Sequence, residues 1–70
     1  MDTMPIRWPM ADGAPVSCRE KLRTLEENHA EAVQTLQDAF EDAVLMGVDE
    51  QHMRRVFHDM VAGLRSPKRG

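Results

Sequence analysis

The sequence predicts an all-α protein, an antiparallel hairpin of one long helix and one shorter helix. Residues 18–46 contain no proline or glycine and are rich in Leu, Ala, Glu and Gln, which favour helices. Between residues 53 and 64 the apolar residues recur at i, i+3, i+4, i+7, i+8 and i+11, which is typical of one apolar stripe on a helix. Because only residues 47–49 join the two segments, we expect the helices to run antiparallel.

The composition limits the chain to one small domain and excludes several function classes. Its 70 residues are 41% hydrophobic and only 4% aromatic, too apolar for complete disorder and too poor in rings for a dense core. A formal net charge of -3 excludes a strongly basic chain that wraps nucleic acid. One cysteine cannot form an internal disulfide, and no apolar run is long enough for a signal peptide or a membrane span, so we expect a cytoplasmic protein.

Residues 1–17 are expected to form a flexible arm. Three prolines within this stretch leave too little room for a helix or a central strand. Its apolar residues include Trp8, the single tryptophan of the chain. Two roles remain open for Trp8, which can pack against the domain or serve as an extra anchor for a partner.

The first helix is expected to begin at Ser17 and to end at Gly47. The run Ser17-Cys18-Arg19-Glu20 has the form of a capping box, in which Ser17 and Glu20 satisfy exposed helix N–H groups reciprocally. Along this helix, residues that step alternately by four and three form a heptad seam. The seam is compatible with a stripe facing the second helix or with an intermolecular coiled coil, and comprises Cys18, Leu22, Leu25, His29, Ala32, Leu36, Ala39, Ala43 and Met46.

The second helix is expected to follow Asp49 as its N-cap and to end before Pro67, which leaves residues 66–70 as a basic tail. The domain proper is therefore the helical hairpin over residues 18–65. Since the second helix is the shorter one, it can cover only residues 32–46 of the first. We expect Leu22 and Leu25 to lack an intramolecular partner and Met53, Val56, Phe57, Met60, Val61 and Leu64 to form one buried stripe.

A two-helix hairpin buries each apolar side chain on one side only. The sequence therefore predicts association, either of two hairpins into a four-helix bundle or of one hairpin with a larger protein. Charge is also divided along the chain: residues 18–47 carry seven acidic and three basic residues, and residues 48–70 carry three acidic and five basic residues. The acidic side chains can pair with arginines of the second helix, within the chain or across a dimer, or with a basic partner.

Catalysis and metal binding find little support in the sequence. Glu26 and His29 have the Glu-x-x-His spacing of di-iron bundles, but a single copy does not make a metal site. Cys18 lies at a helix start beside Arg19 and Lys21, which favours a lowered pKa. Two thin helices form no substrate pocket and no nucleophile is arranged with a base, so we expect neither an enzyme nor a bound cofactor.

The sequence favours a non-enzymatic protein–protein interaction module, such as an adaptor, a small regulator or an accessory subunit of a larger complex. Its expected partners are a second copy of the chain and/or a larger protein with a basic or apolar groove. The alternative is a nucleic-acid-binding or transcription-regulating protein that uses Arg54, Arg55 and Arg65 of the basic second helix together with the C-terminal tail. The residues expected to bind a protein partner are Trp8, Leu22, Leu25, Glu26, Glu27, His29, Glu31, Glu41 and Asp42.

Overall fold

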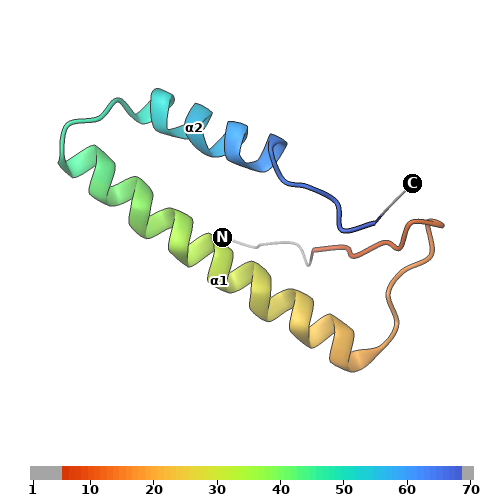
Figure 1. The fold of residues 1–70 in the computed structure, drawn as a ribbon. Coiled ribbons are helices and arrows are strands. Elements are labelled where there is room, and N and C mark those ends of the chain that lie inside the picture. The colour runs from red at the N-terminus through yellow and green to blue at the C-terminus, as the bar shows by residue number, and fades with distance from the viewer. Residues whose placement is uncertain (1–5, 69–70) are drawn as a thin grey trace. The chain divides into compact units, whose positions relative to one another are not determined.

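The computed structural model describes residues 6–68 and contains, within them, two α-helices and no β-strand (Figure 1). Helix α1 spans Arg19–Leu45 and helix α2 spans Glu50–Ala62, so the predicted all-α class is confirmed. The chain divides into two units within α1, an N-terminal unit that ends at Glu31 and a C-terminal unit that begins at Ala32. Residues 1–5 of the expected arm and residues 69–70 of the expected tail lie outside the described residues.

The link between the helices has the form that Gly47 predicts. Gly47 has a φ of 99°, a left-handed conformation that glycine adopts without a steric penalty. Its N–H donates to the carbonyl of Val44 at 3.0 Å, and the N–H of Val48 donates to the carbonyl of Ala43 at 2.9 Å. These two bonds form a Schellman motif, which satisfies the last carbonyls of α1 and reverses the chain into an antiparallel hairpin (Figure 1).

Helix α2 begins as predicted and ends earlier than predicted. The side chain of Asp49 accepts a hydrogen bond of 2.8 Å from the N–H of His52, which confirms Asp49 as the N-cap. The last helical residue is Ala62, and Gly63 forms the C-cap with its N–H bonded to the carbonyls of Asp59 and Met60. Glycine is costly inside a helix, so α2 stops here and not at the later proline.

In the C-terminal unit the apolar faces of the two helices meet next to the link. The half-buried side chains here are Leu36, Phe40, Ala43, Val44, Met53 and Phe57. Val33, which has the same helical spacing, is 50% exposed, and Met60 on α2 is 55% exposed. The prediction that the whole stripe of α2 is buried is therefore wrong, because the contact with a single neighbouring helix does not cover its full width and length.

In the N-terminal unit the predicted capping box at Ser17 is wrong, and the helix starts one residue later. The carbonyl of Cys18 accepts a hydrogen bond from the N–H of Leu22 at 2.9 Å, the first such bond of α1. Cys18 is thus the N-cap of α1. The backbone N–H groups of Lys21 and Glu20 lower the pKa of its thiol, whereas the Ser17 hydroxyl makes no hydrogen bond among the described residues.

Residues 8–16 form a hydrogen-bonded turn, although the sequence led us to expect a flexible arm there. The N–H of Met10 donates to the carbonyl of Ala14 at 2.6 Å, and the N–H of Val16 donates to the carbonyl of Trp8 at 2.9 Å. Pro9 and Pro15 face each other between these two bonds as an isolated antiparallel bridge. They form a non-hydrogen-bonded pair, so neither needs the N–H that proline lacks.

We expect Asp49→Ala to destabilise the C-terminal unit by about 1 kcal/mol, because the N–H of His52 loses its capping acceptor. Urea unfolding followed by circular dichroism measures this change. Asp49→Asn, which keeps a side-chain oxygen, should lose much less stability, and Asp59→Ala serves as the control at an exposed site without a capping role. Equal losses for Asp49→Ala and Asp59→Ala would contradict the assigned cap.

Candidate interaction surface

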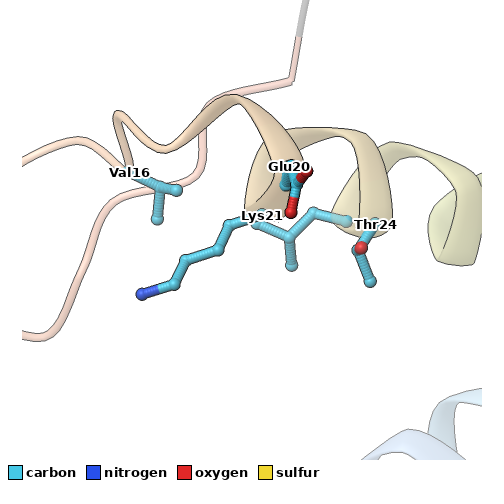
Figure 2. A pocket seen from close by; sticks show the side chains of 5 residues that line it. Val16, Glu20, Lys21 and Thr24 are labelled. Atoms are coloured by element: carbon cyan, nitrogen blue, oxygen red, sulfur yellow. The ribbon is translucent and has the colours of Figure 1, made fainter.

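The two leucines expected to be bare are half-buried in the N-terminal unit. Leu22 shares a shallow hollow with Trp8 and Val16, both from the segment that precedes α1. Leu25 belongs to the lining of a second hollow. Figure 2 shows other side chains of this lining, namely Val16 and, from the first turns of α1, Glu20, Lys21 and Thr24. The expectation that these leucines lack an intramolecular partner is therefore wrong, because the proline-containing segment folds back onto them.

Trp8 and His29, both predicted to bind a partner, contact each other. Their ring centroids lie 6.2 Å apart with an interplanar angle of 76°, an edge-to-face arrangement. The indole Nε1 is shielded from solvent and makes no hydrogen bond. Of the two roles left open for Trp8, the structure thus shows the one in which it packs against its own chain.

The acidic residues of α1 are exposed and have no cationic partner among residues 6–68. The one contact between a basic and an acidic side chain in the described residues joins His58 Nδ1 and Asp59 Oδ1 at 3.7 Å, within α2. Two of the acidic side chains accept hydrogen bonds from glutamine amides instead: Gln37 donates to Glu41 at 2.8 Å, and Gln34 donates to Asp38 at 2.9 Å. Pairing with the arginines of α2 inside the chain is therefore not seen. The predicted partner-binding acids, all exposed, are Glu26, Glu27, Glu31, Glu41 and Asp42.

Arg54 has a role within the C-terminal unit that the sequence did not reveal. Its guanidinium carbon lies 4.8 Å from the centroid of the Phe40 ring, a cation–π contact between α2 and α1. Both side chains line a shallow hollow together with Phe57. Helical spacing could place Phe40 on the contact face, but it gives no information on where a long arginine side chain folds.

The hairpin has an open apolar end, defined here as Val33, Met60, Val61 and Leu64. All four side chains are at least half exposed, and Leu64, just past the end of α2, is 77% exposed. Val33 and Met60 belong to the same apolar stripes as the half-buried residues nearer the link. The apolar stripes of the hairpin thus extend to the open apolar end, where no other side chains of residues 6–68 cover them.

The geometry at the start of α1 lowers the pKa of the Cys18 thiol. The largest cause is the hydrogen bond from the backbone N–H of Lys21, followed by that from Glu20, and the charge of Lys21 adds a small effect. Both bonds favour the thiolate. No three His, Cys, Asp or Glu side chains among residues 6–68 gather as a metal site, and no helix described there is long and apolar enough to cross a membrane.

We expect the alkylation rate of Cys18 to rise with an inflection below the ordinary thiol value of about 8.5, measured with iodoacetamide across pH. A pKa lowered by folding means that the thiolate stabilises the start of α1. That stabilisation is complete above the ordinary pKa of the unfolded thiol and is lost as the pH falls through the folded pKa. In denaturing urea the inflection should return to the ordinary value, and identical profiles in both solvents would disprove the cap.

We expect Arg54→Gln to destabilise the C-terminal unit by about 0.5–1 kcal/mol through loss of the contact with Phe40. The neighbouring exposed Arg55 makes no such contact, so Arg55→Gln is the matched control and should leave the urea midpoint unchanged. If the two variants unfold at the same urea concentration, Arg54 does not stabilise the hairpin.

Comparison of the chain with protein-family models, with curated proteins and with solved structures finds no match.

Proposed function

We propose that this protein is a non-enzymatic interaction module whose first partner is a second copy of the same chain. The observation that carries the proposal is that no side chain among residues 6–68 is buried. The apolar residues reach half-burial at most, so neither unit has an enclosed core. Small domains of this size bury a modest share of their surface and commonly gain stability from oligomerisation.

Two hairpins that pack through their open apolar ends would form a four-helix bundle. Met60 and Leu64 of one copy would cover the open end of the other, and a two-fold axis would repeat the contact. The free energy of association would come from removing apolar surface from water. In a single hairpin this surface stays exposed. The helical seam of α1 would extend such packing as a short coiled coil.

Charge would orient the association. Asp38, Glu41 and Asp42 on α1 have no cationic partner, and Arg55 and Arg65 have no acidic one, among the described residues. Opposite charges on the two copies would align them and raise the association rate. The same acidic side chains, with Glu26, Glu27 and Glu31, suit the basic groove of a larger protein, for which the module would serve as an adaptor, a regulator or an accessory subunit. A single free cysteine agrees with a cytoplasmic location.

Sedimentation equilibrium over a wide concentration range tests the proposal. We expect a dimer or larger species for the natural sequence, and at least a tenfold weaker association for Met60→Glu with Leu64→Glu, about 1.4 kcal/mol. Each glutamate would bring a charge into the apolar contact, and its desolvation opposes association.

Leu45→Glu is the matched control, since Leu45 is 85% exposed in the same unit but lies beside the link, away from the open end and outside the seam. It should associate like the natural sequence. A well-folded monomer at every concentration would refute the proposal, and equal weakening by Leu45→Glu would refute the assigned surface.

A further inference from the structure

The turn over residues 8–16 is held by hydrogen bonds between its own residues. The N–H of Met10 donates to the carbonyl of Ala14, that of Gly13 to Met10 and that of Val16 to Trp8. The side chain of Asp12 adds a fourth bond, accepting from the N–H of Ala14 at 2.9 Å. The hydrogen bonds of the turn are therefore all internal to residues 8–16.

The turn touches α1 through side chains alone. Among the described residues no hydrogen bond or ion pair joins residues 8–16 to α1. The contact consists of Trp8 against His29 and of Trp8 and Val16 beside Leu22. The apolar members are half-buried and none is fully enclosed, and the shielded Trp8 Nε1 has no acceptor. A donor withdrawn from water without an acceptor weakens the docked state.

The surface beneath the turn is one that a helix can use. Leu22, Leu25 and His29 follow the alternating four and three spacing of a heptad seam, which suits a second helix of the same kind. We propose that residues 8–16 are a preformed, displaceable cover that occupies this seam in the free chain, and that α1 of a second copy binds there once the cover moves aside. The inference rests on the self-association proposed above, and adds a cover that limits it.

The joint for this movement is Ser17, which lies between the turn and the N-cap of α1. The structure gives Ser17 no regular secondary structure and no hydrogen bond from its side chain. A change of backbone angles there would carry the turn away as a unit, since its own bonds are internal, and would leave the first turns of α1 capped by Cys18.

The test compares Trp8→Ala with Met10→Ala, a variant of an exposed residue in the same turn. Sedimentation equilibrium should give about tenfold tighter association for Trp8→Ala, because the seam is uncovered, and no change for Met10→Ala. Leu22→Ser added to Trp8→Ala should cancel the gain. Val16→Ala, which weakens the cover from its other side, should shift association in the same direction as Trp8→Ala.

Trp8 fluorescence supplies a readout that does not depend on association. At concentrations below dimer formation, His29→Ala should make Trp8 more accessible to acrylamide quenching, and Met10→Ala should not. Unchanged quenching in His29→Ala would overturn the docked contact.

The two proposals fail in different ways. If the natural sequence associates and Trp8→Ala associates equally or more weakly, the cover is refuted while self-association stands, because Trp8 then contributes to the interface. If the natural sequence stays monomeric and Trp8→Ala dimerises, the cover is supported and association through the open apolar end is refuted. If every variant stays monomeric with unchanged helicity, both proposals are refuted.

Discussion

Two helices in contact cannot enclose a side chain, and this limit explains most of the structure. Each helix of the hairpin shields one arc of its neighbour, so Phe40 and Phe57 reach half-burial and remain open on their other sides. The remaining stabilisation comes from features that do not need a core. They are the Schellman motif at Gly47, the cap at Asp49 and the stacking of Arg54 on Phe40.

The N-terminal unit also lacks an enclosed core in its described residues, but here a turn and not a second helix covers the apolar residues of α1. Leu22 and Leu25 are half-buried, as are the residues between α1 and α2, because Trp8 and Val16 of the preceding segment return to them. The indole of Trp8 is the largest side chain of this contact. In this unit a short hydrogen-bonded turn takes the place that α2 has in the C-terminal unit.

Sequence reasoning identified the features that depend on local chemistry. Gly47, Asp49 and the apolar face of residues 32–46 follow from backbone preference and helical spacing, and the structure shows each of them. The extent of burial was overestimated, since periodicity shows which side of α2 is apolar and not how much of it a neighbour covers. The cap at Cys18 was missed because cysteine is an uncommon N-cap and a serine preceded it. The contact of Trp8 with His29 joins residues 21 positions apart, and no periodic pattern connects a turn with a helix.

The pairing of Pro9 with Pro15 has a consequence for the outer edges of the turn. In an antiparallel pair, the two residues of a non-hydrogen-bonded position direct their backbone groups outward, where another strand could add to the ladder. Here both outward positions lack a donor because both are prolines. Exposed apolar surface favours intermolecular sheet formation, and the two prolines prevent a further strand from bonding to either outer edge of this turn.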